Sequence, residues 1–347
     1  MRDHQSLSDL YKQAEQCHNR GDFRGAIARW EEVAAQARAQ GDHGYELAAL
    51  ASLPVAWGNI ADFEKEVEAA TRLLARAREL KREDYTMRAG LRLTEALVSL
   101  DLRGRWWELR PLLLEGLETA KRLGEHWCEV YHLKTLGQYA IMVGEEEQGY
   151  AWLQDALNAI RPDMGEFQLY FRAEIYAGFS LLMRKRGDYA EAIRYAEMAV
   201  GAWRDYGNPS FVVSGQLNLA QAEQARGELA EALRLVEEVL LQARQMGWRG
   251  TEQEAEYSRS ELERVLGHAD VAETAARRAL ELAREMKLKE EEVECLLSWG
   301  QALLALRRNE EAREILRQAR RRSQEQDYED HFSKAEELLA VLQAQSV

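Results

Sequence analysis

The stretch RGDYAEAIRYAEMAV, from Arg186 to Val200, is typical of a turn followed by a helix. Gly187 and Asp188 supply the turn, and the alanines behind them recur at helical spacing. Asp188 is a residue type that caps helix N-termini, and Glu191, three residues later, is expected to bond back to its amide. A single Gly-Asp turn fits either a ligand-binding loop or punctuation between two helices. Its recurrence along the chain favours punctuation.

The turn at Gly187 recurs at intervals of 40 or 43 residues. Its counterparts are Gly21, Ala61, Gly104, Gly144, Gly227, Gly267 and Arg307. A small residue stands five positions after most of these turns: Ala26, Gly149, Ala192, Ala232, Ala272 and Ala312. Another stands seven positions before most of them: Ala14, Gly137, Ser180, Ala220, Ser260 and Gly300. The pattern indicates stacked copies of one unit, in which two helices cross closely at the small residues.

A second turn is expected twenty residues after each of the first turns. The residues at this position are Gly41, Gly124, Gly207, Gly247, Lys81, Met164 (with Gly165 next), Lys287 and Asp327. Glycine here is the residue expected at a left-handed helix C-cap. Each period therefore predicts two helices of about 17 residues, roughly 25 Å long at about 1.5 Å per residue.

The composition agrees with an all-α prediction. Of the 347 residues, 46% are hydrophobic and 31% charged, and only four are prolines. No linker rich in Pro, Gly or Ser divides the chain, so we expect one solenoid domain over residues 1–347. Repeats cover about residues 7–327. An amphipathic helix at about 329–345 is expected to cap the last repeat with an apolar face of Phe332, Ala335, Leu338, Leu339 and Leu342.

The charge and the termini bear on partners and location. A formal net charge of −14 disfavours direct binding of nucleic acid, and the basic run at 317–324 fits a solvated helix face. The N-terminus resembles no secretory signal, and no apolar run approaches the ~20 residues that span a bilayer. Cys17, Cys128 and Cys295 show neither disulfide nor metal spacing. We therefore expect a cytoplasmic protein that does not bind membranes.

The small residue in the first helix, the Gly-Asp turn and a late alanine in the second helix resemble the tetratricopeptide repeat (TPR), in eight copies. The late alanines are Ala156, Ala199, Ala279 and Ala319. The second and third copies are degenerate. The period of 40 residues, against about 34 in the standard repeat, is similar to the long repeats of kinesin light chains, spindle-orientation adaptors, maltose-type activators and Rap-like regulators. The resemblance implies a right-handed superhelical solenoid whose first helices line a concave groove for a peptide or protein.

The sequence lacks the phosphate-loop, dinucleotide, zincin and nucleophile-elbow motifs. The stretch GEHWCEVYH places Cys128 and His132 one helical turn apart, beside Glu129. This fits a metal site or a polar repeat boundary, and the boundary is favoured because no second ligand pair stands nearby. We expect no catalysis, no metal and no cofactor. Trp106 and Trp107 fit either interior packing or an exposed anchor for a partner.

Residues expected to face the groove are found by counting back from each turn. They are Tyr11, His18, Tyr131, Lys134, Gln138, Glu174, Arg184, Asn218, Gln221, Tyr257 and Arg264. Tyrosines among charged and amide side chains suit hydrogen bonding and stacking with a partner, although an ordinary solvated helix face has a similar composition. Asn218 stands in the string NLA, which resembles the Asn that grips an extended peptide in long-repeat adaptors.

Two functions follow from this reading, and both are binding functions. The first is a non-enzymatic scaffold or adaptor that binds a protein or peptide in the groove. The alternative is a regulatory sensor that binds a signal peptide or small ligand and controls a partner such as a transcription factor. Because each repeat touches only its neighbours, a solenoid deforms easily, which suits a sensor. The sequence leaves the oligomeric state open.

Overall fold

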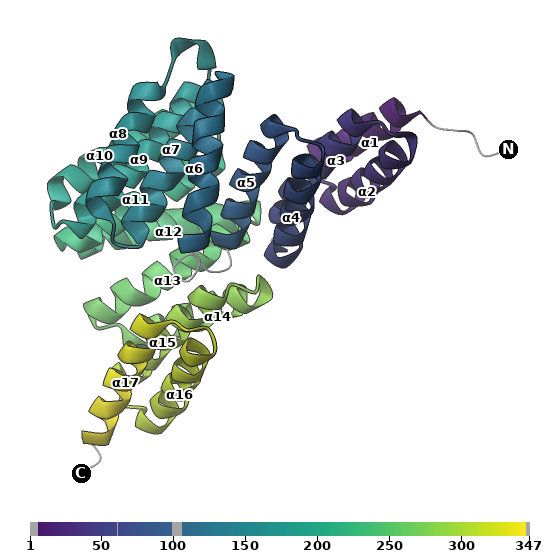
Figure 1. The fold of residues 1–347 in the computed structure, drawn as a ribbon. Coiled ribbons are helices and arrows are strands. Elements are labelled where there is room, and N and C mark those ends of the chain that lie inside the picture. The colour runs from purple at the N-terminus through teal and green to yellow at the C-terminus, as the bar shows by residue number, and fades with distance from the viewer. Residues whose placement is uncertain (1–5, 61, 99–105, 345–347) are drawn as a thin grey trace. The chain divides into compact units, whose positions relative to one another are not determined.

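The computed structural model describes residues 6–60, 62–98 and 106–344, and this part of the chain is helical, without a strand. Its elements are α1 Leu7–Asn19, α2 Phe23–Gln40, α3 His43–Asn59, α4 Phe63–Glu79, α5 Glu83–Val98, α6 Trp106–Leu123, α7 His126–Met142, α8 Glu146–Ala159, η1 Pro162–Met164, α9 Phe167–Lys185, α10 Tyr189–Tyr206, α11 Pro209–Arg226, α12 Leu229–Met246, α13 Arg249–Leu266, α14 Ala269–Glu285, α15 Lys289–Ala305, α16 Asn309–Glu325 and α17 Glu329–Ala344. Figure 1 shows consecutive helices lying side by side in hairpins. Among the described residues, no helix is both long and apolar enough to cross a membrane. The expected all-α repeat fold is confirmed.

The chain divides into two compact units, Met1–Leu136 and Gly137–Val347. The division falls inside α7, and each unit is described by itself. The expectation of a single domain stays a prediction. The expected turns at Ala61 and Gly104 lie outside the described residues.

Left-handed backbone is found at the expected turns that the structure describes, except at Met164. Met164 ends η1, and Gly165 after it has φ 59° with ψ −137°, so the predicted left-handed cap is wrong there. Elsewhere Gly187, for example, has φ 77° and Gly207 has φ 83°. Four turn positions occupied by larger residues adopt the same region, with φ between 53° and 58°: Lys81, Lys287, Arg307 and Asp327. The Cβ atom of any residue other than glycine is strained in this conformation. The repeat geometry therefore dictates the backbone even where glycine is missing.

Asp188 caps α10 as expected, because its Oδ1 accepts a hydrogen bond from the amide of Glu191 at 3.3 Å. The expected return bond from Glu191 is wrong. Its carboxylate instead accepts from Arg194, and the amide of Asp188 already donates to the carbonyl of Met183 at 2.9 Å. The αL turn satisfies this amide from within the preceding helix, so no side chain is needed there.

The small residues lie where paired helices cross, as predicted. A Cβ atom at Gly137 would lie 3.0 Å from the carbonyl oxygen of Gly149, so the two backbones touch. In later repeats a serine uses the same proximity. Ser180 Oγ donates to the carbonyl of Ala192 at 2.7 Å, and Ser260 Oγ donates to that of Ala272 at 2.9 Å. The crossing therefore accepts only small side chains.

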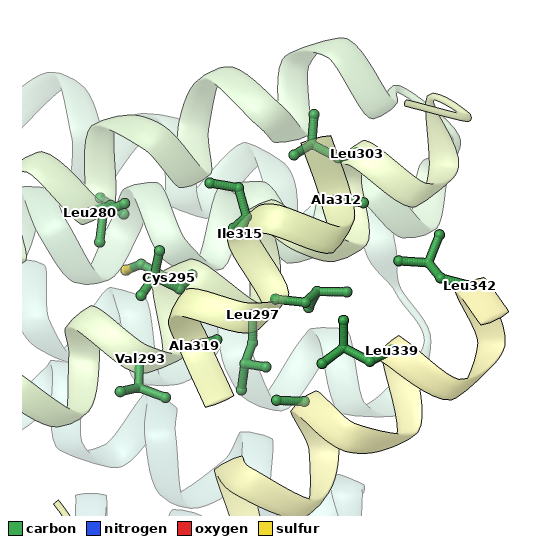
Figure 2. Packing of buried hydrophobic residues seen from close by; sticks show 14 of the residues in the cluster. Leu280, Val293, Cys295, Leu297, Leu303, Ala312, Ile315, Ala319, Leu339 and Leu342 are labelled. Atoms are coloured by element: carbon green, nitrogen blue, oxygen red, sulfur yellow. The ribbon is translucent and has the colours of Figure 1, made fainter. Parts of the chain in front are cut away.

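The last helix, α17, closes the second unit. Ala335, Leu339 and Leu342 are buried and pack in one cluster with residues of α14, α15 and α16, such as Leu280 and Ile315 (Figure 2). Burial of each large apolar side chain contributes about 1.5–3 kcal/mol. The expected capping role of this segment is confirmed.

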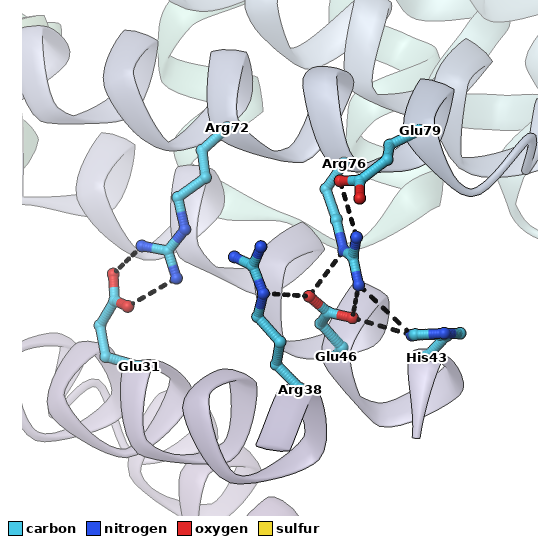
Figure 3. A network of polar contacts seen from close by, with 7 residues as sticks. All are labelled: Glu31, Arg38, His43, Glu46, Arg72, Arg76 and Glu79. Carbon is cyan, nitrogen blue, oxygen red and sulfur yellow. Dashed lines mark hydrogen bonds and ion pairs between the residues drawn. The ribbon is translucent and has the colours of Figure 1, made fainter. Parts of the chain in front are cut away.

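Glutamates near the starts of three first helices connect helices of neighbouring repeats. Glu46 of α3 is only 2% exposed. Its carboxylate contacts Arg38 of α2, Arg76 of α4 and, within α3 itself, His43 (Figure 3). Burial opposes its ionisation, but hydrogen bonds from Arg76 and His43 outweigh burial and keep the pKa of Glu46 below its ordinary value. The result is an ionic contact among three consecutive helices.

The same arrangement recurs twice in the second unit. Glu252 contacts Arg244 at 3.5 Å and Arg278 at 3.1 Å. Glu292 contacts Arg284 at 3.0 Å and Arg322 at 3.7 Å. Like Glu46, both glutamates stand five residues after a second turn.

First helices form their own layer in each unit. In the second unit, α9 contacts α11, α11 contacts α13, α13 contacts α15, and α15 contacts α17. In the first unit, α1, α3 and α5 contact one another in the same order. Because side-by-side helices of this layer touch across repeats, their outward sides form a continuous surface. We call the surface on α9, α11, α13, α15 and α17 the first-helix face.

Candidate functional site

The first-helix face of the second unit carries most of the residues selected from the sequence. They stand 13, 10, 6 or 3 residues before a turn, and this spacing places them on one side of a helix. Those on this face are Glu174, Arg184, Gln221, Tyr257 and Arg264, with Asn218 three residues before Gln221 on α11, and Gln138 lies in the same unit on α7. All are half-buried, so each is held by neighbours while part of its surface stays accessible.

A chain of polar contacts crosses three helices of this face. Arg184 Nη1 on α9 donates to Gln221 Oε1 on α11 at 2.6 Å. Gln221 Nε2 in turn donates to Glu254 Oε1 on α13 at 3.3 Å. A bridging amide between a cation and an anion fixes all three side chains, because each end of the amide is matched by charge.

The ends of this chain are electrostatically unusual. Burial lowers the pKa of Arg184, although the nearby Glu254 opposes the effect. Burial raises the pKa of Glu254, and the neighbouring Glu294 adds to the increase, whereas Gln221 and Arg184 oppose it. The Glu254 side chain is nonetheless exposed to water. Arg184 is half-buried and Glu254 is exposed, so both charged groups are accessible to a ligand.

Tyr257 and Arg264 lie on the same side of α13. Burial raises the pKa of Tyr257, and the carboxylates of Glu294 and Glu261 raise it further. Arg264 Nη2 donates to Glu261 at 2.7 Å, and Ser298 of α15 donates to the other oxygen of Glu261 at 2.6 Å. In this part of the face Glu261 is held by Arg264 and Ser298, and the Tyr257 phenol lies beside these charged groups.

Beyond Tyr257 the face becomes acidic. Glu290, Glu291 and Glu294 lie on α15, and His331 lies on α17. Burial raises the pKa of Glu291 to about 7, and the carboxylates of Glu294 and Glu290 contribute to the increase. His331 Nε2 lies 3.6 Å from Glu294 Oε1. Negative charge is thus concentrated where the face ends.

Gln138 has a structural contact at the beginning of the second unit. Its Nε2 donates to the backbone carbonyl of Glu174 at 2.9 Å, which joins α7 to α9. The bond holds the backbone and not the carboxylate of Glu174. The predicted partner-binding role of both residues stays a prediction.

The remaining predicted residues lie in the first unit. Tyr131 and Lys134 are each 7% exposed, and the Lys134 ammonium lies 4.6 Å from the centre of the Tyr131 ring. Tyr11 packs edge-on against Trp30, and His18 packs edge-on against Phe23. The structure brings Tyr131 and Lys134 together and gives Tyr11 and His18 aromatic neighbours. Their role toward a partner stays a prediction.

The sequence left two interpretations open for the Cys128–His132 stretch and two for the pair Trp106 and Trp107, and the structure shows the surroundings of each. Cys128 and His132 are both buried, and His132 Nδ1 lies 2.7 Å from the carbonyl oxygen of Cys128, so this nitrogen has a backbone partner. Trp106 is 2% exposed and packs inside, whereas Trp107 is 72% exposed. Trp106 thus fits interior packing, whereas Trp107 fits an exposed anchor for a partner.

Sequence reasoning missed Glu254, Glu294 and His331. Glu254 and Glu294 each stand 13 residues before a turn, at the position that Glu174 occupies in its own repeat. Counting every repeat in full would have found both. His331 follows the last turn, so counting back from turns offers no signal for it.

These features define the class of the chain, which has the helical-repeat fold of TPR proteins. It is similar to the apo form of RapI, with a TM-score of 0.64 and 11% identity over 81% of this chain and 98% of RapI. It is also similar to the Rap conjugation gene regulator of the plasmid pLS20 in complex with the Phr* peptide, with a TM-score of 0.63, 13% identity, and coverage of 81% and 74%.

A third similar structure is a STAND protein (signal transduction ATPase with numerous domains) with a tetratricopeptide repeat sensor, from Pyrococcus horikoshii. The TM-score is 0.61 at 12% identity, and 99% of this chain matches 51% of that one. This chain therefore spans about half the length of the STAND protein. No family model matches the sequence, and no curated protein matches it.

Proposed function

We propose that this chain is a regulatory binding protein that takes a peptide or a segment of a partner protein on its first-helix face. The observation that carries the proposal is the Arg184–Gln221–Glu254 chain, which presents a cation, an amide and an anion along three helices. An extended peptide has alternating donors and acceptors, and these groups match them. Asn218, three residues before Gln221, adds another amide on the same helix.

The similar structures support a peptide ligand in this kind of fold. One of them, the pLS20 regulator, is described in complex with a peptide, and another contains a TPR sensor. Likeness of fold does not transfer a ligand, so the proposal depends on the polar chain itself.

The adaptor and the sensor remain two versions of this function. The sensor is supported by helix contacts that, in the described part of the chain, lie mainly within one repeat or between adjacent repeats, because a ligand that crosses several repeats can then change their spacing. The adaptor requires only the binding surface. A binding role, and not catalysis, is common to both.

A selection from a displayed peptide library against the immobilised chain tests the proposal. Peptides that are enriched are expected to bind the wild-type chain, and Arg184→Gln and Glu254→Gln are expected to weaken them. Arg194→Gln is the matched control, because Arg194 is an exposed arginine paired with Glu191 on the second helix α10. No enrichment over bare resin, or equal binding by the two test variants and the wild type, would refute the proposal.

A further inference from the structure

Three potential metal donors meet at the end of the first-helix face. Glu290 and Glu294 stand one turn apart on α15, and His331 reaches them from the neighbouring helix α17. One donor atom of each lies within 4.8 Å of the others, and His331 Nε2 is 3.6 Å from Glu294 Oε1. The two helices belong to the same buried cluster, so the backbone that carries these donors is well supported.

We propose that Glu290, Glu294 and His331 form a binding site for a divalent cation of the zinc class. One imidazole and two carboxylates are ligands that Zn²⁺ accepts, at about 2.0–2.2 Å from the metal. Donors around such an ion lie roughly 3.3 Å apart in a tetrahedron. The existing separations reach this value by small rotations of side chains that are only partly buried.

The surroundings favour a cation. Glu291 on α15 and Glu254 on α13 add two carboxylates to the same region. The Tyr257 phenol, on α13, lies near the carboxylate of Glu294. A metal ion would relieve the repulsion among the carboxylates, which no neutral ligand would do.

Three protein donors leave at least one coordination position for water or for an oxygen of a ligand. The mixed donor set distinguishes the site from a purely acidic surface patch, since the imidazole gives selectivity for borderline ions over Mg²⁺ and Ca²⁺. The inference does not depend on the proposed peptide function, because it needs only the local geometry of α15 and α17.

Isothermal titration of the full chain with ZnCl₂ tests the proposal. Cys17→Ser is included in every protein, because Cys17 is a partly exposed thiol that can bind zinc by itself. We expect one saturable site that binds about one zinc ion per chain. Glu294→Gln and His331→Asn are each expected to weaken zinc binding at least about tenfold. Loss of a residue that only supports a metal ligand already weakens binding by about this factor, so loss of a ligand itself is expected to cost no less.

His268→Asn is the matched control, since His268 Nδ1 also lies beside a glutamate, Glu263 at 2.7 Å, but among the described residues it belongs to no such group of three donors. It is expected to leave zinc binding unchanged, and circular dichroism verifies that every variant is folded. The proposal is overturned if the chain shows no saturable zinc binding with a dissociation constant below about 100 μM, a value between the micromolar and millimolar limits of weak binding. It is equally overturned if His331→Asn binds zinc as the wild type does, because the carboxylates alone then hold the ion.

Discussion

The guanidinium of Arg76 holds the buried carboxylate of Glu46 with two hydrogen bonds, from Nε at 2.8 Å and from Nη2 at 2.9 Å (Figure 3). The pair joins α3 to α4, and Arg38 and His43 contact the same carboxylate. Because the two side chains are 3% and 11% exposed, water cannot replace either partner well. The contact therefore belongs to the supporting structure of the repeat stack.

Replacing Arg76 with alanine is expected to destabilise the chain by about 2–3 kcal/mol, since a buried carboxylate loses its main partner. Arg72→Ala is the control, because its partner Glu31 is 44% exposed and the pair contributes less than about 1 kcal/mol. Urea unfolding of the two variants measures the difference. Equal losses would show that burial of Glu46 has no energetic consequence.

His132 predicts a dependence of stability on pH. Its side chain is fully buried, Nε2 has no hydrogen-bond partner among the described residues, and burial lowers its pKa below the ordinary value of 6.5. The unfolded chain then takes up a proton that the folded chain resists, so stability is complete above pH 6.5 and is lost as the pH falls below it. The slope is at most about 1.4 kcal/mol per pH unit.

The variant His132→Asn isolates this effect, since asparagine does not titrate. We expect the stability advantage of the wild type over the variant, measured by urea unfolding, to shrink between pH 7.5 and pH 5.5. An advantage that stays constant over this interval would mean that His132 protonates equally in both states.

Two helical glycines are expected to respond in opposite directions to alanine. A Cβ at Gly137 would lie 2.7 Å from the Leu153 side chain and 3.0 Å from the Gly149 oxygen, so Gly137→Ala is expected to cost about 1–3 kcal/mol. A Cβ at Gly201 meets nothing within 4 Å, so Gly201→Ala is expected to stabilise by about 0.5–1 kcal/mol. Thermal unfolding of both variants compares them, and a shift of the same sign would contradict the crossing geometry.

Much of the fold could be predicted because its signals are local and repeated. Gly187 marks a turn, Ala192 marks a crossing, and each signal recurs with the same period, so errors in one copy are corrected by the others. The exception is Glu191. Its expected bond to the Asp188 amide depended on that amide being free, and the turn itself supplies a carbonyl partner. Competition of this kind is invisible in a sequence motif.

The site could be predicted only in part because it depends on contacts between helices. Arg184 and Gln221 stand 37 residues apart, and periodicity places both on one face without showing that they bond. His331 lies on the capping helix, where the repeat has ended, so its approach to Glu294 depends on how α17 packs. Likewise, helical spacing could not distinguish the buried Trp106 from the exposed Trp107.

Glu291 gives a last prediction, in the direction opposite to that of His132. Its pKa is raised from 4.5 to about 7, so the folded chain holds a proton that the unfolded chain has already released between these values. Its stabilising contribution is complete below pH 4.5 and is lost as the pH rises toward 7. Glu291→Gln resembles the protonated acid at every pH. We therefore expect this variant to match the wild type near pH 4.5 and to be more stable at pH 8, by on the order of 1 kcal/mol.

Urea unfolding at both pH values, with a chelator present to remove metal ions, measures this difference. Glu281→Gln on α14 is the control, because Glu281 is exposed and pairs with Arg278 at 3.3 Å, and its effect is expected to stay within about 0.5 kcal/mol at either pH. If Glu291→Gln instead loses stability at pH 8, the carboxylate is ionised in the folded chain and favourably bound.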